Sequence, residues 1–123
     1  MDKEVWENSA IQLEENLKKA LTELLILRLL TERDYYIGEL TDTLSERSGG
    51  VLNVVFPYAA VYRMLEQGTI REIEKRVAPD GRRRQYYGIT QRGRARYNLL
   101  RDTYRRFSNG VSAILPKEGE HHE

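Results

Sequence analysis

The chain has 123 residues, which is enough for one domain with its own core and too few for two. Hydrophobic residues make up 40% and charged residues 32%, as in an ordinary folded globular protein, and there is no cysteine for a disulfide or a thiolate metal site. No apolar run reaches the ~18 residues of a membrane span, and the mixed-charge N-terminus leads into no apolar segment of a signal peptide. The composition therefore predicts a cytoplasmic protein without a membrane partner.

The net charge of +1 hides an uneven distribution along the chain. Residues 1–70 hold 7 Lys/Arg against 12 Asp/Glu, a net charge of −5, whereas residues 71–106 hold 12 against 4, a net charge of +8. Residues 107–123 have a net charge of −2. A strongly basic segment favours a polyanionic partner, although charge alone leaves a solvated basic face as the alternative.

Residues 4–31 are predicted to form a helix, because their apolar residues recur at alternating steps of four and three. This stripe consists of Trp6, Ala10, Leu13, Leu17, Ala20, Leu24 and Leu27. Between Leu21 and Leu30 apolar residues occupy the other faces as well, so we expect this second half to be buried nearly all round. The first half, with its single stripe, is expected to pack against one neighbour.

A second helix is predicted over residues 36–47 and a third from Pro57 to Gln67. Proline suits the first helical position, because the N–H that it lacks has no partner there, and Gly68 supplies a left-handed cap. The intervening run 51–55 is predicted to be β-prone. The acidic residues around the start of the second helix are interpreted as solvated charges, namely Glu32, Asp34 and Glu39.

A hairpin and a last helix complete the predicted elements. Residues 70–77 and 82–89 are β-prone runs on either side of an Ala-Pro-Asp-Gly turn, which predicts two paired strands. Thr90 is a suitable N-cap for a helix over 91–115, which Pro116 ends. The apolar stripe of this helix also alternates steps of three and four and consists of Tyr97, Leu100, Tyr104, Phe107, Val111 and Ile114.

This order of elements predicts a mostly α-helical fold with a small β-hairpin, arranged as a winged helix-turn-helix with N- and C-terminal dimerisation helices. We expect residues 1–90 to form the DNA-binding domain together with its N-terminal helix. Residues 91–115 are expected to form the C-terminal dimerisation helix, and residues 116–123 a disordered tail.

In a winged helix-turn-helix the third helix enters the major groove of double-stranded DNA and the hairpin lies along the phosphate backbone. Guanidinium groups pair with phosphates in a bidentate fork, so basic residues beside the hairpin turn are candidates for backbone contacts. A phosphate contact is favoured for Arg63, and for Tyr62 inward packing is the alternative. The candidate DNA-binding residues are Tyr58, Ala59, Tyr62, Arg63, Lys75, Arg76, Arg82, Arg83, Arg84 and Gln85.

The two apolar stripes exceed what so small a core can absorb, which favours a partner that covers them. Closed twofold dimers are the commonest oligomers, so a homodimer is predicted, with packing of the first helix on the last within one chain as the alternative. The candidate interface residues are Trp6, Leu13, Leu17, Tyr97, Leu100, Tyr104, Phe107, Val111 and Ile114. The candidates for binding a small aromatic effector, with ordinary interface packing as the alternative, are Trp6, Tyr97 and Tyr104.

Catalysis is not expected from this sequence. The only histidines, His121 and His122, lie in the predicted tail, where no fixed metal geometry is expected. With no cysteine and no Gly-rich phosphate loop, neither a metal nor a cofactor is predicted. The main alternative to a DNA-binding regulator is a winged-helix protein-interaction module without sequence-specific DNA binding.

Several segments resemble the PadR family of transcriptional regulators, over about residues 17–110. The most specific is a glycine followed by basic residues and two tyrosines, placed between a turn and a threonine cap. The matching segments are Leu17-Lys18-Lys19, Leu24 to Leu30, Asp34-Tyr35-Tyr36, Glu46 to Gly50, Gly81 to Tyr87, and Ile89-Thr90 with Gly93-Arg94-Ala95.

The resemblance implies a winged-helix dimer, held by its terminal helices, that binds a pseudo-palindromic operator. Most members of the family repress, and many release DNA when a small aromatic or toxic compound binds. By this resemblance Tyr58 begins the recognition helix, Arg82 to Arg84 form the basic run of the wing, and Tyr104 lies where some relatives have an aromatic residue at a ligand cavity. The chain departs from the family pattern at Phe56-Pro57, at Tyr36-Ile37-Gly38, at Gly88, where a basic residue is common, and at Gln91-Arg92, which replaces an acidic pair.

Overall fold

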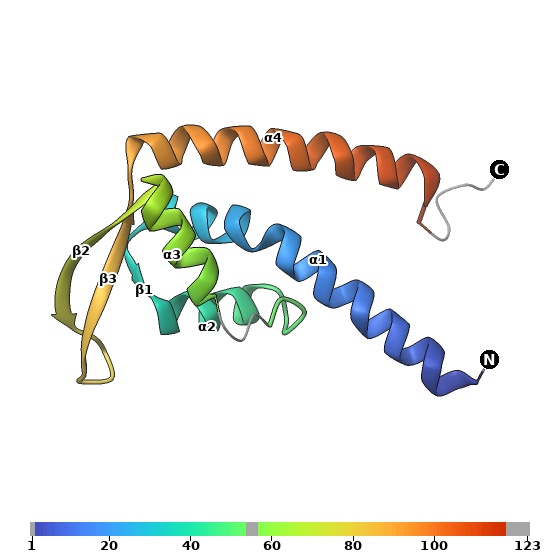
Figure 1. The fold of residues 1–123 in the computed structure, drawn as a ribbon, viewed down its shortest axis with the longest axis horizontal. Helices are drawn as coiled ribbons and strands as arrows, with labels where there is room; N and C mark the ends of the chain where they lie inside the picture. The colour runs from blue at the N-terminus through green and yellow to red at the C-terminus, as the bar shows by residue number, and fades with distance from the viewer. Residues whose placement is uncertain (1, 54–56, 118–123) are drawn as a thin grey trace.

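The computed structural model describes residues 2–53 and 57–117. Within them, the helices and strands follow one another in the order that Figure 1 shows. Their bounds are α1 Lys3–Glu32, β1 Tyr35–Tyr36, α2 Ile37–Arg47, α3 Tyr58–Gln67, β2 Ile70–Val77, β3 Arg83–Ile89 and α4 Gln91–Ile114. The predicted fold class, mostly helical with a small sheet, is confirmed.

The core forms around the second half of α1, as the all-round apolar pattern of that half predicts. Ile26 and Leu27 are completely buried, and α2, α3, β3 and α4 all contact this helix. Leu40 of α2 and Met64 of α3 are also fully buried. In the first half of α1, by contrast, every described residue up to Leu17 is exposed.

The sheet contains a strand that the sequence analysis did not predict. β1 pairs antiparallel with β3, so the strand order is β1-β3-β2. Tyr35 lies opposite Tyr87, and Tyr36 lies opposite Tyr86. Two residues are too few to show an alternating pattern, and the prediction had placed Tyr36 in the second helix. β1 joins the hairpin to the start of α2.

Two further predictions differ from the structure. Residues 51–53 lie in a turn or in no regular element, so the first part of the predicted β-prone run is wrong, and residues 54–56 lie outside the described residues. Pro57 is the N-cap of α3, which begins at Tyr58, one residue later than predicted.

The hairpin turn and the start of α4 follow their sequence signals. Gly81 has a φ of +85°, a left-handed conformation that glycine adopts without strain. The N–H of Ala78 donates to the carbonyl of Arg82 at 2.8 Å, which closes the turn. The hydroxyl of Thr90 accepts a hydrogen bond from the N–H of Gly93 at 3.0 Å, so Thr90 caps α4 as predicted.

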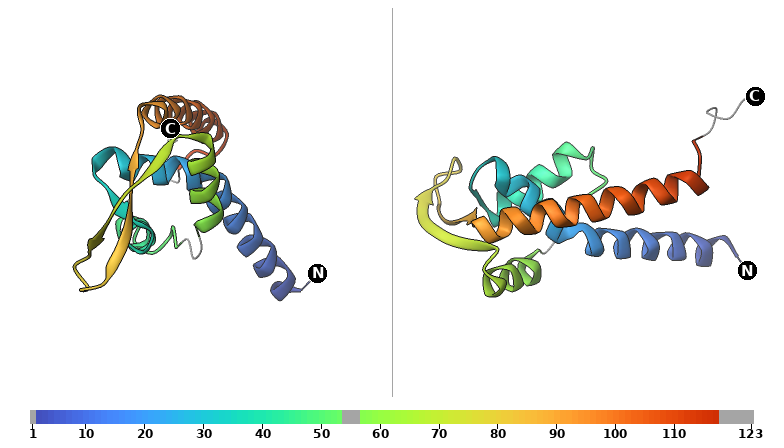
Figure 2. Two further views of the ribbon diagram at one scale, coloured as in Figure 1. Left: turned by 60° about the vertical axis from the view of Figure 1, so that its left-hand side comes forward. Right: turned by 90° about the horizontal axis from the view of Figure 1, so that it is seen from above.

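α1 and α4 contact each other at one end and diverge toward the other, where both termini lie (Figures 1 and 2). At the contacting end, Glu23 of α1 accepts two hydrogen bonds from Arg96 of α4, at 3.0 and 3.3 Å. Tyr97 and Leu100 of α4 are half-buried there and pack against the core. Packing of the first helix on the last within one chain therefore accounts for this end and leaves the diverging ends exposed.

We expect Gly93→Ala to destabilise the fold, because an added Cβ would overlap the backbone oxygen of Thr69. That oxygen is already held by the N–H of Thr90 at 3.1 Å, so α4 would have to move, and we expect a loss of about 2 kcal/mol. At Gly110, the matched control in α4, a Cβ meets nothing within 4 Å, so Gly110→Ala should raise stability by about 0.5–1 kcal/mol. Urea unfolding followed by circular dichroism measures both, and equal effects would contradict this packing.

Candidate nucleic-acid interface

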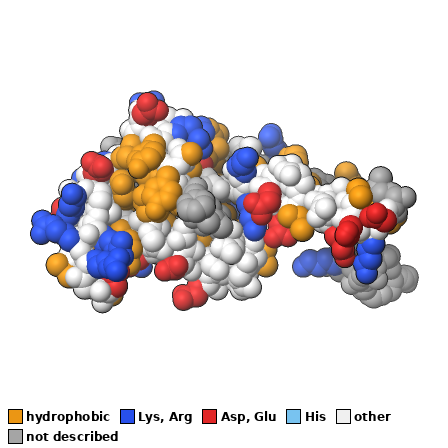
Figure 3. All heavy atoms as spheres, turned by 60° about the horizontal axis from the view of Figure 1, so that its bottom comes forward, with side chains coloured by type: hydrophobic (Ala, Val, Ile, Leu, Met, Phe, Trp, Pro, Cys, Tyr) orange, Lys and Arg blue, Asp and Glu red, His pale blue; other side chains and the backbone are white. Residues whose placement is uncertain are grey.

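α3 buries one face and exposes the other. The buried residues are Ala60, Val61 and Met64. Tyr58 and Tyr62 are 46% and 59% exposed, and Ala59 and Arg63 are exposed beside them. Tyr62 therefore points to solvent, against the alternative of inward packing. On the face that Figure 3 shows, hydrophobic side chains gather in a patch flanked by Lys and Arg side chains.

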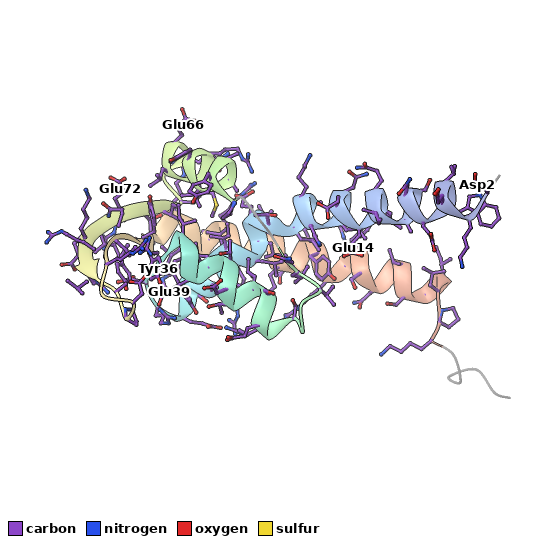
Figure 4. The ribbon with its side chains drawn as sticks, turned by 90° about the horizontal axis from the view of Figure 1, so that it is seen from below. Asp2, Glu14, Tyr36, Glu39, Glu66 and Glu72 are labelled. Carbon is purple, nitrogen blue, oxygen red and sulfur yellow. The ribbon has the colours of Figure 1, made fainter. Side chains whose placement is uncertain are left out.

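α3 also exposes an acidic residue that the sequence analysis did not single out. Glu66 is exposed and projects from α3 away from the rest of the molecule (Figure 4). It follows Tyr62 by four residues, which places both on the same helical face. That spacing was the signal in the sequence that could have identified it.

Three of the basic candidates lie exposed on the hairpin. Lys75 is on β2, Arg82 lies between the two strands, and Arg83 begins β3. The ion pairs found in the hairpin, within the part of the chain that the structure describes, include none of these three side chains. Their charges are therefore directed to solvent, where a polyanion could contact them.

The other two arginine candidates of the hairpin, Arg76 and Arg84, have partners within the protein. Nη2 of Arg76 lies 3.0 Å from Oδ2 of Asp34, and its guanidinium lies over the ring of Tyr86, 4.6 Å from the ring centre. Nη2 of Arg84 lies 2.6 Å from Oδ2 of Asp80. This hydrogen bond, with a second from a backbone N–H, lowers the pKa of the Asp80 carboxyl below its ordinary value.

The last hairpin candidate, Gln85, is also engaged locally. Its side-chain amide donates to the carbonyl of Tyr86 at 3.0 Å and, more weakly, to the carbonyl of Glu74 at 3.4 Å. The structure therefore divides the predicted hairpin contacts into three exposed cations and three side chains with intramolecular partners.

Three carboxylates that were interpreted as solvated charges are in ion pairs, so that interpretation is wrong. Glu32 accepts two hydrogen bonds from Arg47, at 2.7 and 3.1 Å, and these lower the pKa of Glu32. Glu39 lies 3.3 Å from Arg33, and Asp34 pairs with β2 as described above. The partners of Glu32 and Asp34 lie 15 and 42 residues away along the chain, so no local pattern shows them.

An open depression lies between the hairpin and the start of α2. Its lining residues are Arg33, Asp34, Glu39, Arg76, Pro79 and Tyr86. Figure 4 labels Tyr36 and Glu39 in this region, at the start of α2. Because positive and negative side chains alternate around the depression, it offers no region of a single sign to a charged ligand.

The candidate dimer residues fall into two groups. Tyr97 and Leu100 pack against the core of their own chain. The remaining candidates are exposed, and they are Trp6, Leu13, Leu17, Tyr104, Phe107, Val111 and Ile114. Trp6, Phe107 and Ile114 are 63%, 68% and 79% exposed, which is unusual for large apolar side chains on the diverging ends of two long helices.

One chain does not bring the effector candidates together. Trp6 lies in the first turn of α1 and Tyr97 in the first third of α4, and these helix ends are at opposite ends of the molecule (Figure 1). Tyr97 is near Arg101, whose guanidinium lies 5.4 Å from the ring centre. Within one chain, therefore, Trp6 and Tyr97 cannot line a common cavity.

The described residues hold no group of three or more His, Cys, Asp or Glu side chains that could bind a metal. His121 and His122 lie outside the described residues, as does most of the predicted tail. Among the described helices none is long and apolar enough to cross a membrane.

α1, α2 and α3 pack together, α3 exposes one face, and a β-hairpin follows it. This arrangement defines a winged helix-turn-helix protein. The family model of the PadR-like transcriptional regulators matches residues 26–99, and the chain belongs to this family. Membership supports a role in regulating transcription through DNA binding. No curated protein matches the chain significantly.

Solved structures show the same fold. A PadR-like transcriptional regulator from Bacillus cereus is 23% identical, with a TM-score of 0.70, and the match covers 84% of this chain and 99% of that one. A PadR family regulator from Eggerthella lenta is 20% identical, with a TM-score of 0.73 and coverage of 95% and 97%. A Streptococcus transcriptional regulator is 26% identical, with a TM-score of 0.68 and coverage of 80% and 95%.

Two departures from the family pattern have local explanations. A Cβ at Gly88 would lie 2.6 Å from Cδ1 of Ile73 and 3.0 Å from Oδ1 of Asp34, so a larger residue would disturb both. The Cδ of Arg92 comes within 3.9 Å of the Cβ position at Gly68, beside the C-terminus of α3, where the helix dipole favours a cation. Phe56 lies outside the described residues.

Proposed function

We propose that this chain is a homodimeric DNA-binding repressor that recognises a pseudo-palindromic operator. One observation carries the proposal: side chains suited to DNA are exposed on α3 and on the hairpin. These are the two elements that a winged helix places in the major groove and along the phosphates. Membership of a family of transcriptional regulators supports the same function.

In this proposal α3 supplies the sequence reading. Tyr58 and Ala59, at its start, face base edges, where an alanine methyl group can pack against a thymine methyl. Arg63 bonds a phosphate, since phosphates take more than half of protein–DNA contacts. Glu66, at the far end, can accept a hydrogen bond from N4 of cytosine and repels phosphates, so it restricts which sequences fit.

The dimer forms through the diverging ends of α1 and α4, whose exposed stripes need a partner. Residues 2–16 hold five acidic residues and one basic residue, whereas α4 holds six arginines and one aspartate. Opposite signs favour α1 of one subunit against α4 of its partner, and like charges disfavour α1 against α1. A twofold dimer of this kind presents two recognition helices to a pseudo-palindromic site.

A small aromatic effector that releases DNA is part of the same proposal. Trp6, Tyr97 and Tyr104 come from both helices of the proposed interface, so a second chain can supply the residues that one chain keeps apart. Trp6 is the only tryptophan, so quenching of its fluorescence reports ligand binding there. The chain acts in the cytoplasm, by binding and without catalysis, metal or cofactor.

The alternative is a winged-helix module that binds another protein and reads no DNA sequence. The exposed acidic Glu66 on α3 and the overall net charge of +1 favour it. Both features weaken attraction to phosphates, and neither hinders a protein partner.

Fluorescence anisotropy separates the two functions. The probes are a random-sequence duplex and a duplex from the intergenic region upstream of the chain's own gene, each at two salt concentrations. We expect upstream DNA to bind at least ~1,000-fold more tightly than random DNA, with two chains per site. Weak and equal binding to both duplexes would instead support the interaction module.

We expect Arg83→Ala to weaken binding to every duplex and to lower the salt slope of the affinity by about one, because one phosphate contact is lost. Arg94→Ala removes the same charge from an exposed position in the first turn of α4, at the other end of β3. Anisotropy titrations over a salt series measure both slopes. An unchanged slope for Arg83→Ala, or an equal change for Arg94→Ala, would count against a phosphate contact at Arg83.

Phe107→Asp should weaken the dimer about tenfold or more, because a carboxylate without a partner would be buried in the apolar stripe. Asn109→Asp adds the same charge two residues later, at an exposed position outside the stripe, and should leave the dimer nearly unchanged. Sedimentation velocity over a concentration series measures both association constants. A monomeric wild-type chain, or equal weakening by the two substitutions, would refute the proposed interface.

A further inference from the structure

We propose that Arg76 and Arg84 are positioning residues, which hold the hairpin against the body of the protein, and that Asp34 is their anchor. The inference rests on the proposed function, since it concerns how the hairpin is presented to DNA. Among the hairpin residues predicted to contact DNA, it assigns the direct phosphate contacts to Lys75, Arg82 and Arg83.

Arg76 connects β2 to the segment just before β1. Its Nη2 lies 3.0 Å from Oδ2 of Asp34, and its Nε lies 3.4 Å from Oε1 of Glu74. Its guanidinium also lies over the ring of Tyr86 on β3, 4.6 Å from the ring centre. One side chain therefore contacts groups on both hairpin strands and on the body, so hairpin movement would break several contacts together.

Arg84 extends the same set of contacts toward the turn. Its Nη2 lies 2.6 Å from Oδ2 of Asp80, and its guanidinium lies 5.2 Å from the ring centre of Tyr36. Its Nε is buried, which removes one of its donors from any phosphate in solution. Tyr36 in turn meets Tyr86 edge to face, with ring centres 5.5 Å apart.

These contacts form one continuous network across the sheet. It runs from Asp34 through Arg76, Tyr86 and Tyr36 to Arg84, and the ladder between β1 and β3 lies beneath it. Cation–π contacts and edge-to-face rings are directional, so they restrict orientation as well as distance. The network therefore restricts the angle between the hairpin and the helices.

Gly88 leaves room for the carboxylate of Asp34. A Cβ at this position would lie 3.0 Å from Oδ1 of Asp34, the carboxylate that holds Arg76. Any larger side chain would push this carboxylate away from β2. The absence of a side chain at Gly88 thus fits a role of Asp34 as the anchor.

Charge supports the division between positioning and contacting residues. Arg76 faces two carboxylates, Asp34 and Glu74, and Arg84 faces Asp80. Three negative charges beside two guanidinium groups leave this side of the hairpin without net attraction for phosphate. Exposed ion pairs of this kind contribute little to the free energy of unfolding. In this proposal their role is instead to fix the orientation of the hairpin.

Asp34→Asn tests the proposal by the sign of its effect on DNA affinity. The substitution removes a negative charge and releases Arg76, so affinity would rise if Arg76 bound phosphate directly. The positioning role predicts a fall of up to about fivefold, the upper end of what loss of one exposed ion pair costs. Glu72→Gln is the matched control, because it removes an exposed carboxylate from β2 that forms no ion pair within the described residues.

Arg76→Ala adds a second readout, the salt slope of DNA affinity, which would fall if Arg76 contacted a phosphate. We expect weaker binding with an unchanged salt slope, whereas loss of a phosphate contact lowers the slope by about one. The double variant with Asp34→Asn should bind like either single variant, because both act through one contact. Tighter binding by Asp34→Asn, or a lower slope for Arg76→Ala, would overturn the proposal.

Hydrogen exchange, measured without DNA, tests the positioning role independently of the proposed function. Backbone amides of residues 75–85 should exchange faster in Asp34→Asn and in Arg76→Ala than in wild type, and at the wild-type rate in Glu72→Gln and Arg83→Ala. Unchanged exchange in the first two variants would overturn the positioning role, whatever the DNA binding. A wild-type chain that binds no duplex specifically would refute the proposed function, while the exchange rates would still decide the role of Asp34 and Arg76.

Discussion

The burial of one helical segment determines the arrangement of the whole chain. The second half of α1 is apolar on all sides, and its completely buried residues Ile26 and Leu27 can avoid water only if other elements surround them. α2, α3, β3 and α4 do so. Two ion pairs, Glu23 with Arg96 and Glu32 with Arg47, then join α1 to α4 and to α2. The proposed DNA-binding elements and the long helices therefore pack against one buried helical segment.

The charged residues around this buried part of α1 fall into separate groups. The acidic first half of α1 and the arginines of α4 lie on the helices of the proposed dimer, and the exposed cations of the hairpin lie on the proposed DNA-binding side. Arg76 and Arg84 of the hairpin are paired with carboxylates of the same chain. A single basic segment in the sequence thus divides in space into groups available to a partner and groups engaged in holding the structure.

Much of the fold could be predicted from the sequence, because helix periodicity and caps are local signals. The steps of three and four located both long helices, Thr90 and Gly68 marked helix ends, and the turn at Gly81 located the hairpin. β1 was missed because two residues show no period, and its existence depends on pairing with a strand some fifty residues later. The predicted start of α3 was one residue too early, because proline is compatible with both the N-cap and the first turn.

The candidate site was predictable to a different extent. The sequence by itself determined which elements carry it and which residue types are present, because amphipathic spacing fixes which face of α3 is buried. It could not show that Arg76 and Arg84 are engaged while Arg83 is exposed, since all three have the same chemistry and lie in one basic segment, residues 71–106. Only the tertiary structure decided this, because Asp34 lies 42 residues from Arg76 along the chain, and the antiparallel pairing of both β1 and β2 with β3 brings their side chains within 3.0 Å.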